Sequence, residues 1–115
     1  MRILGLVLLI AATFSFGAGA QVRLTEYTDK NGYIDVQKLT CAQLAGTFQE
    51  DADFLSTWYS GWYNGLAKRH LMHPARAKEL EHRLIVYCKE NTNKKVIQAI
   101  DTVFKAYRLE KGIKL

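Results

Sequence analysis

Two kinds of side chain in this 115-residue sequence are able to do chemistry: the cysteines Cys41 and Cys88, and the histidines His70, His73 and His82. Two cysteines so far apart cannot supply the four closely spaced ligands of a structural zinc site, whereas they can form one disulfide. His70 and His73 have His-x-x-His spacing across a predicted helix break, but histidines at a basic helix end are more often solvated than metal-bound. We therefore predict no metal site.

A catalytic arrangement has little support in the sequence. Glu79 and His82 stand three residues apart on one predicted helix. General-base chemistry also needs a nucleophile within hydrogen-bond reach, and both cysteines are expected to be oxidised. We predict that the chain is not an enzyme and needs no cofactor.

The first 20 residues, MRILGLVLLIAATFSFGAGA, have the features of a secretory signal peptide. Arg2 provides a basic start, an apolar run covers residues 3–16, and Ala18 and Ala20 have the A-x-A spacing of a cleavage site. The run is shorter than the roughly 20 residues that cross a bilayer, although a retained membrane anchor is the alternative. We expect cleavage after Ala20, export, and a single domain without stable membrane insertion.

An exported domain meets an oxidising environment, where an even number of cysteines normally pairs. A bridge between Cys41 and Cys88 would contribute about 4 kcal/mol in chain-entropy estimates. Because a covalent bond does not depend on pH, the bridge would persist in acid that removes salt bridges.

Residues 21–37, QVRLTEYTDKNGYIDVQ, form a polar N-terminal arm before the first helix. Asn31-Gly32 is a hairpin-type turn signal between two short segments that contain apolar residues. A short hairpin and a disordered tail are the two alternatives for this arm.

Local signals mark the first two helices. Thr40 and Gln43 match a capping box, which opens a short helix that ends near Gly46. The acidic cluster in residues 50–53 suits the start of a second helix. We expect this helix to run to about residues 68–70, where basic residues suit a C-terminus.

Two further helices follow. His73-Pro74 starts the third, because proline is favoured in a first helical turn, and residues 91–93 are an N-cap candidate for the fourth. Charged pairs at i, i+4 mark the outer faces: Glu79 with Arg83, and Asp101 with Lys105. Apolar residues at helical spacing form the inward stripes: Ala77, Leu80, Leu84, Tyr87 and Cys88 in the third helix, and Val96, Ile97, Ile100, Val103, Phe104 and Tyr107 in the fourth.

These elements predict the fold class. We expect an all-α domain after the signal peptide, a small four-helix bundle with one short helix and three longer ones, stapled by one disulfide. The domain is expected to cover residues 38–110, with a C-terminal tail at 111–115.

The second helix carries much aromatic surface in the stretch FLSTWYSGWYNGL, residues 54–66. At 100° per residue, its apolar side chains sweep about 180° of the circumference, more than the roughly 100° that one core contact needs. We therefore expect the helix to face more than one partner, most of its aromatics in the core and part of the surface in a homodimer. This predicted client-binding or dimer surface consists of Phe54, Leu55, Trp58, Tyr59, Trp62, Tyr63 and Leu66.

Gly61 and Gly65 stand four residues apart in or beside this aromatic surface. Two glycines cost a helix about 2 kcal/mol relative to alanine. Their spacing lets another backbone approach, so we expect close helix packing to offset the cost.

Four segments carry a family resemblance: LTCAQL (39–44), WYSGWY (58–63), VYCKEN (86–91) and KKVIQAI (94–100). Their order and spacing resemble the HdeA/HdeB family of periplasmic acid-stress chaperones over about residues 36–104. The resemblance implies a small helical periplasmic protein, often dimeric at neutral pH, with a disulfide between the first and third helices. It also implies that the protein loses structure in strong acid and then holds denatured periplasmic proteins.

Two features depart from the family pattern. Thr92 stands where the family often has proline, and the mature chain is basic where the best-known members are closer to neutral. Of the 16 Lys and Arg, one lies in the signal peptide; the rest exceed the 11 Asp and Glu by four.

The composition is compatible with an acid switch. At a pH of about 2 the carboxylates are neutral, while the mature chain's 15 Lys and Arg and its three His carry +18. This self-repulsion opposes the compact state, and pairs such as Glu79 with Arg83 lose their stabilising effect as the pH falls through the folded pKa of the carboxylate. The aromatic surface would then become available to denatured proteins.

Most small basic proteins also charge up in acid, so a second hypothesis stays open. The chain would then be a periplasmic interaction module, of an immunity type or envelope-associated, without chaperone activity. Nucleic acid is not an expected partner, because an exported protein rarely meets it, and the basic residues are better explained as a solvated face.

Overall fold

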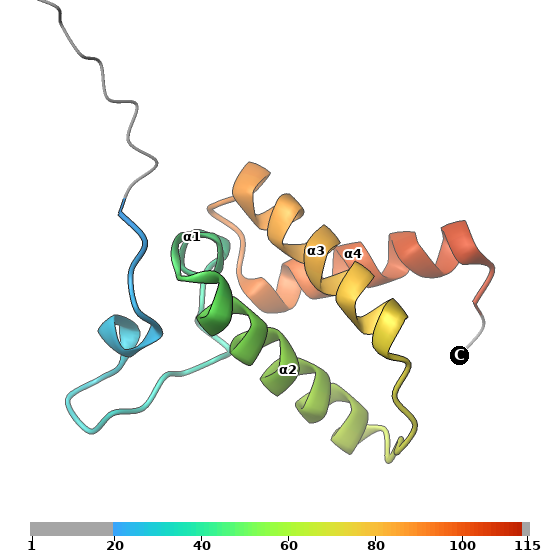
Figure 1. Ribbon diagram of the computed structural model, residues 1–115, viewed down its shortest axis with the longest axis horizontal. Coiled ribbons are helices and arrows are strands. Elements are labelled where there is room, and N and C mark those ends of the chain that lie inside the picture. The colour runs from blue at the N-terminus through green and yellow to red at the C-terminus, as the bar shows by residue number, and fades with distance from the viewer. Residues whose placement is uncertain (1–19, 114–115) are drawn as a thin grey trace, which may run out of the picture.

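The computed structural model of the chain describes residues 20–113, so the predicted signal peptide lies outside the described residues except for Ala20. Four α-helices follow one another: α1 (Cys41–Gly46), α2 (Gln49–Leu66), α3 (Pro74–Glu90) and α4 (Val96–Lys111). Within residues 20–113 there is no β-strand, only two isolated bridges. The predicted all-α class, with one short helix and three longer ones, is confirmed (Figure 1).

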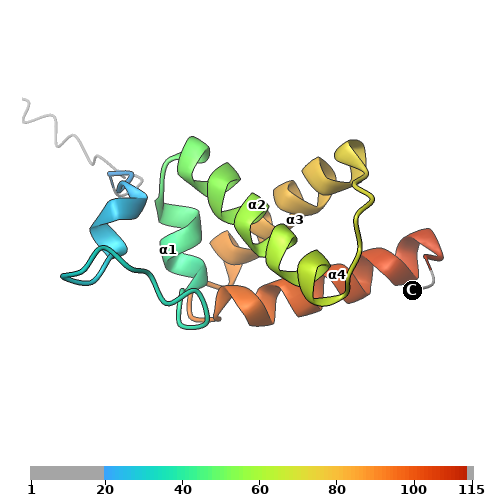
Figure 2. The ribbon, with the colours of Figure 1, turned by 90° about the horizontal axis from the view of Figure 1, so that it is seen from below.

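α1 contacts each of the other three helices, and α3 also contacts α4. Figures 1 and 2 show the N-terminal arm beside α1 at one end of the molecule and the α2–α3 connection at the other. The core between these elements is formed by Leu39, Cys41, Leu44, Ala52, Leu55, Tyr59, Leu84, Cys88, Val96, Ala99, Ile100 and Val103.

The predicted disulfide is confirmed. Cys41 at the start of α1 and Cys88 near the end of α3 are bonded, with their Cα atoms 4.5 Å apart. Both residues are fully buried, which agrees with the inward position expected for Cys88. The bridge therefore fixes α1, the shortest of the four α-helices, to α3.

The capping box of α1 is also confirmed. The Thr40 N–H donates to Gln43 Oε1 at 2.9 Å, and the Gln43 N–H donates to Thr40 Oγ1 at 3.2 Å. The first turn is held from outside as well, because the Cys41 N–H donates to the Lys94 carbonyl at 2.7 Å. The start of α1 is thus fixed by a local signal and by the segment that precedes α4.

α3 begins as predicted and α4 does not. His73 is the N-cap of α3, its Nδ1 accepting from the Arg76 N–H at 3.2 Å, and Pro74 occupies the first turn. The N-cap of α4 is Lys95, whose N–H donates to Gln98 Oε1 at 3.1 Å, rather than a residue in 91–93. Residues 91–95 instead form the turn whose carbonyl groups receive hydrogen bonds from α1.

α2 ends at Leu66, before the basic residues expected to close it. The Lys68 N–H donates to the Gly65 carbonyl at 3.1 Å, and the Arg69 N–H donates to the Asn64 carbonyl at 2.9 Å. This is the bond pattern of a Schellman motif, and Lys68 takes the left-handed conformation that it requires, with φ 54°. The basic residues therefore lie in the connection to α3.

The N-terminal arm forms neither a hairpin nor a free tail. Residues 24–27 make one short 3-10 helix, and the arm is docked on the domain, because the Val22 N–H donates to the Gly46 carbonyl and the Leu24 N–H donates to Asp51 Oδ2. At the expected hairpin turn, the Asp29 carboxylate accepts from the backbone N–H groups of residues 31 and 33. This side chain satisfies donors that a second strand would otherwise need to pair.

Candidate functional site: the aromatic surface of α2

The predicted aromatic surface of α2 divides into a covered part and an open part. Leu55 and Tyr59 are buried, with 3% and 2% of their surfaces exposed, and Trp62 packs partly against the core. The Tyr59 hydroxyl donates to the Val36 carbonyl, which ties the N-terminal arm to α2, and burial raises the Tyr59 pKa. For these residues the predicted core role is confirmed.

The other members of the surface are exposed, which corrects the expectation that most of the aromatics lie in the core. The neighbouring chain elements cover only one side of α2, so an arc as wide as this one cannot be buried within a single protomer. The exposed members, with their exposed fractions, are Phe54 (66%), Trp58 (44%), Tyr63 (38%) and Leu66 (69%).

The aromatic rings contact one another along α2. The ring centroids of Trp58 and Trp62 lie 5.6 Å apart, and those of Trp62 and Tyr63 also lie 5.6 Å apart. Centroid separations in this range are favourable for aromatic pairs. Trp62 therefore links the exposed rings of Trp58 and Tyr63 in one run of aromatic contacts along α2.

Gly61 and Gly65 lie on the open side of α2. Together with Phe54 and Trp58 they occupy positions i, i+4, i+7 and i+11, so all four share one side of the helix. A Cβ atom added at either glycine would have nothing within 4 Å. The close packing expected at these glycines has no partner within the described chain. We call these four residues the α2 stripe.

A pair of carboxyl groups links α2 to α3 next to this surface. Glu81 on α3 and Asp53 on α2 share a hydrogen bond, and Asp53 Oδ1 also accepts from the Gln49 side chain at 2.8 Å. Burial, followed by the contact with Asp53, raises the pKa of Glu81 to about 7, while the same hydrogen bond lowers the pKa of Asp53. No sequence pattern predicts this pair, because its two members are far apart in the chain.

The raised pKa of Glu81 opposes loosening of the fold in mild acid. A carboxyl group with a raised folded pKa stabilises the fold below its unfolded pKa of about 4.3, and this contribution is lost as the pH rises through the folded value of about 7. Acidification from pH 7 to about pH 5 therefore strengthens the contact between α2 and α3.

Glu81→Gln is expected to remove this pH dependence while keeping a hydrogen bond to Asp53. At pH 8 the variant should be more stable than the wild type by about 1 to 2 kcal/mol, after allowance for solvent screening of a partly exposed pair, and at pH 5 the difference should nearly vanish. Urea unfolding at the two pH values measures both. Glu90→Gln, an exposed change on the same helix, is the control, and an identical pH profile for the two variants would contradict the assignment.

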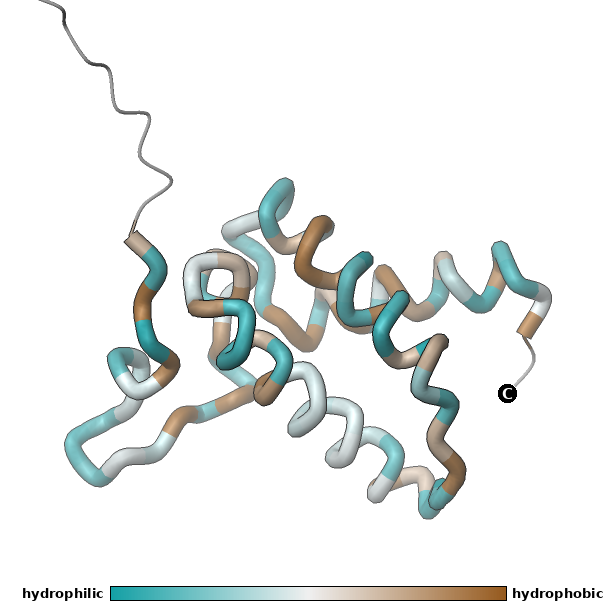
Figure 3. The backbone as a smooth tube through the Cα atoms, in the orientation of Figure 1, coloured by the Kyte–Doolittle hydropathy of each residue, from teal (hydrophilic) through white to brown (hydrophobic). Residues whose placement is uncertain are grey.

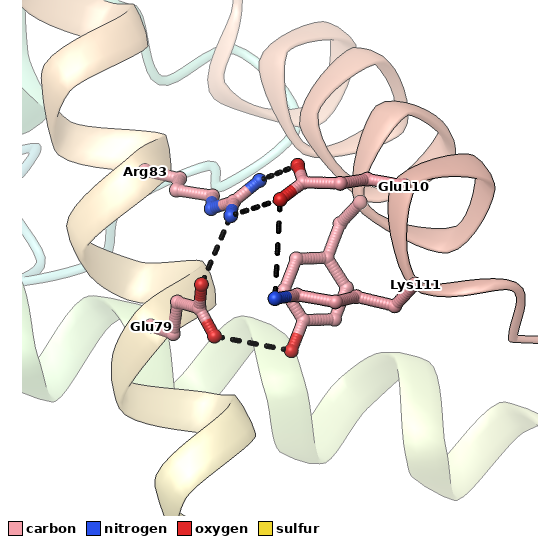
Figure 4. Close-up of polar contacts among 5 residues, drawn as sticks. Glu79, Arg83, Glu110 and Lys111 are labelled. Atoms are coloured by element: carbon pink, nitrogen blue, oxygen red, sulfur yellow. Dashed lines mark hydrogen bonds and ion pairs between the residues drawn. The ribbon is translucent and has the colours of Figure 1, made fainter.

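A second charged cluster joins α3 to α4 and has the opposite pH dependence (Figure 4). The predicted pair is confirmed, since Arg83 Nη2 lies 2.9 Å from Glu79 Oε1, and the same guanidinium also forms two hydrogen bonds to Glu110 on α4. The Tyr107 hydroxyl donates to Glu79 at 3.2 Å, and the Arg83 guanidinium lies over the Tyr107 ring, 5.0 Å from its centroid.

Arg83 holds the pKa of Glu110 below its ordinary value. A carboxylate with a depressed folded pKa stabilises the fold above its unfolded pKa, and that contribution is lost as the pH falls through the folded value. The α3–α4 cluster therefore weakens only in strong acid.

The histidines do not assemble into a site. His73 uses its Nδ1 to cap α3, and His70 and His82 are exposed. Over residues 20–113, no three side chains of the His, Cys, Asp or Glu type come together in a way that would hold a metal ion. In the same part of the chain, no helix is long and apolar enough to cross a membrane.

Comparison with protein families gives a match to the model of the HdeA/HdeB family, over residues 3–98 of the chain. This range contains α1, α2, α3 and the start of α4, with both half-cystines and the whole aromatic surface. A search of curated proteins and a search of solved structures gave no match.

Proposed function

The chain belongs to the HdeA/HdeB family, which is known for periplasmic acid-stress chaperones, and from this premise we propose that it is itself a periplasmic holdase. It would loosen at low pH and bind denatured proteins through apolar surface, which prevents their aggregation. The observation that carries the proposal is the open part of the α2 surface, formed by Phe54, Trp58, Tyr63 and Leu66.

Exposed aromatic and apolar side chains of this kind suit unfolded polypeptides. Denatured proteins expose apolar side chains without a fixed shape, and flat aromatic rings bind them without requiring a specific sequence. The neighbouring positive charge of the chain would keep such complexes apart in solution, because in acid the clients are positively charged as well.

We further propose that at neutral pH the α2 stripe is covered by a second copy of the chain. The stripe has large rings, Phe54 and Trp58, in its first half and two glycines, Gly61 and Gly65, in its second half. If two copies pack antiparallel about a twofold axis, the rings of one copy lie on the glycines of the other. This homodimer would give the glycines the close contact that they lack within one protomer.

Acid would then separate and loosen the two copies. Each mature chain carries up to +18 from its Lys, Arg and His side chains once its carboxylates are neutral. Repulsion between the copies and the loss of the Arg83–Glu110 contact would both destabilise the folded homodimer. The stripe and the adjacent rings would become free for clients at the pH at which clients denature.

Phe54→Ser combined with Trp58→Ser tests both parts of this proposal. The mature wild-type protein, in excess, is expected to suppress light scattering by an acid-labile enzyme at pH 2 to 3. Roughly tenfold more of the double variant should be needed, since two exposed aromatic contacts are lost. At pH 7 the wild type should sediment as a dimer and the double variant as a monomer.

Leu109→Ser is the matched control. Leu109 is 85% exposed on α4, outside the α2 surface, so its replacement should leave both the scattering assay and the sedimentation unchanged. If the wild type fails to suppress aggregation at any excess, the chaperone function is removed. A periplasmic interaction module without chaperone activity is then the remaining hypothesis.

A further inference from the structure

Besides the aromatic surface of α2, the end of the molecule around the α2–α3 connection also exposes apolar side chains. Residues 54–78 contain no Asp or Glu, although they contain four Lys and Arg. In the structure, the connection exposes two successive apolar side chains, Leu71 (85%) and Met72 (75%), and the basic residues Lys68 and Arg69 are exposed beside them. Figure 3 shows this short hydrophobic segment with hydrophilic residues on both sides of it in the chain.

α4 brings further positive charge to the same end. Arg69, Lys105 and Arg108 line one groove between α2 and α4, with a volume of about 310 Å³ and with Tyr63 and Phe104 among its walls. Lys105 is paired with Asp101 at 2.9 Å. Among the described residues, Arg69 and Arg108 have no acidic side chain within ion-pair distance.

These observations define a surface that we call the basic tip: Lys68, Arg69, Leu71, Met72, Arg76 and Arg108. Arg76 lies in the first turn of α3, directly after the connection. Figures 1 and 2 agree that the α2–α3 connection and the C-terminal half of α4 lie at the end of the molecule opposite to the N-terminal arm. The basic tip is therefore separate from the α1 end.

The positive charges and exposed apolar side chains of the basic tip together favour one class of partner over others. Nucleic acid or a polyanionic sugar would form ion pairs with the cations of the basic tip. It would make no favourable contact with the exposed apolar side chains of Leu71 and Met72. A second copy of the chain would bring the same positive charge, and like charges in contact repel each other. A bilayer with anionic phospholipids offers both counterparts, negative phosphate groups at the surface and an apolar layer directly beneath it.

We propose that the basic tip docks on the surface of membranes that contain anionic phospholipids. Leu71 and Met72 enter the headgroup region, while Lys68, Arg69, Arg76 and Arg108 face lipid phosphates. Tyr63, which lines the same groove as Arg69, has the amphipathic ring that is favoured at a membrane surface. The chain would bind reversibly and lie on the membrane without crossing it, close to where proteins denature at the envelope.

Vesicle co-sedimentation of the mature protein at pH 7 tests this proposal. Binding is expected to vesicles of phosphatidylcholine with phosphatidylglycerol, and not to phosphatidylcholine alone, and it should weaken when salt is raised from about 0.05 to 0.5 M. Lys68→Gln with Arg69→Gln should reduce the partition coefficient about tenfold to thirtyfold. Leu71→Ser with Met72→Ser should reduce it by a similar factor.

Lys94→Gln with Lys95→Gln is the matched control, because it removes the same charge from the exposed turn at the start of α4, away from the basic tip. An equal loss in this control would show that only net charge matters and would overturn the proposal. So would unchanged binding by the Leu71/Met72 variant, equal binding to both vesicle types, or no binding at all. Client protection in solution without lipid is measured separately, so failure of one proposal is distinguishable from failure of the other.

Discussion

Cys41→Ala combined with Cys88→Ala is expected to lower the free energy of unfolding at pH 7 by about 2 to 5 kcal/mol. The bridge joins residues 47 positions apart, so its loss releases a long loop in the unfolded chain. It also removes the covalent hold on α1, a helix of six residues that is too short to persist without tertiary contacts. For a domain of this size, such a loss is a large part of the total stability.

Urea unfolding followed by far-ultraviolet circular dichroism measures this effect, with the wild type in oxidising and in reducing buffer beside the variant. At pH 2, X-ray scattering should show a larger radius of gyration for the variant, because the covalent link between α1 and α3 persists when acid loosens the rest of the fold. A loss below about 1 kcal/mol, with unchanged dimensions in acid, would show that α1 is held by its caps and hydrogen bonds alone.

Features of the fold that depend on neighbouring residues could be predicted from the sequence. The capping box at Thr40 and the proline at the start of α3 act over three or four positions, and the structure has both. The inward stripes of α3 and α4 and the outer pair of Asp101 with Lys105 follow from helical periodicity in the same way. The disulfide followed from the expected oxidising compartment and an even cysteine count.

Features set by distant contacts could not be predicted. α4 starts at Val96, although residues 91–93 offer an N-cap signal, because residues 91–95 form a turn that accepts hydrogen bonds from α1. α2 ends early because Lys68 takes a left-handed conformation. Lysine adopts this conformation rarely, so the sequence does not predict it. The N-terminal arm docks through Asp51, more than twenty positions along the chain from its partner Leu24.

The residues of the candidate site were predicted from the sequence, but not which of them are buried and which are exposed. Periodicity places Phe54 and Leu55 in the same apolar arc, yet 66% of one and 3% of the other is exposed. Which part of the arc is covered depends on where α1, the arm and the core approach α2. The Asp53–Glu81 pair could not be predicted for the same reason, because its members approach only when α2 and α3 come together.

The two charged clusters have opposite pH dependence. From pH 7 to about pH 5, protonation of Glu81 strengthens the α2–α3 contact. Below the ordinary carboxylate pKa of about 4, the depressed pKa of Glu110 makes the α3–α4 contact weaken as the pH falls further. A holdase with this arrangement would stay closed in mild acid and loosen only in strong acid.

Leu55→Ala is expected to lower the free energy of unfolding by about 2 to 5 kcal/mol, because it leaves a cavity under α2. Leu55 is buried against the core cluster, and its neighbour Phe54 points away from the core. Phe54→Ala is therefore expected to cost less than about 0.5 kcal/mol in the isolated protomer. The two positions lie in the same helical turn, so alanine propensity affects both variants alike.

Urea unfolding at low protein concentration, where the protomer is isolated, measures this contrast between Leu55→Ala and Phe54→Ala. Repeating it at high concentration adds the proposed homodimer, which stabilises only chains with an intact α2 stripe. The cost of Phe54→Ala should then grow with concentration, while the concentration dependence of Leu55→Ala should match that of the wild type. Equal costs at low concentration would show that Phe54 is covered within its own protomer, and the division of the aromatic surface would be wrong.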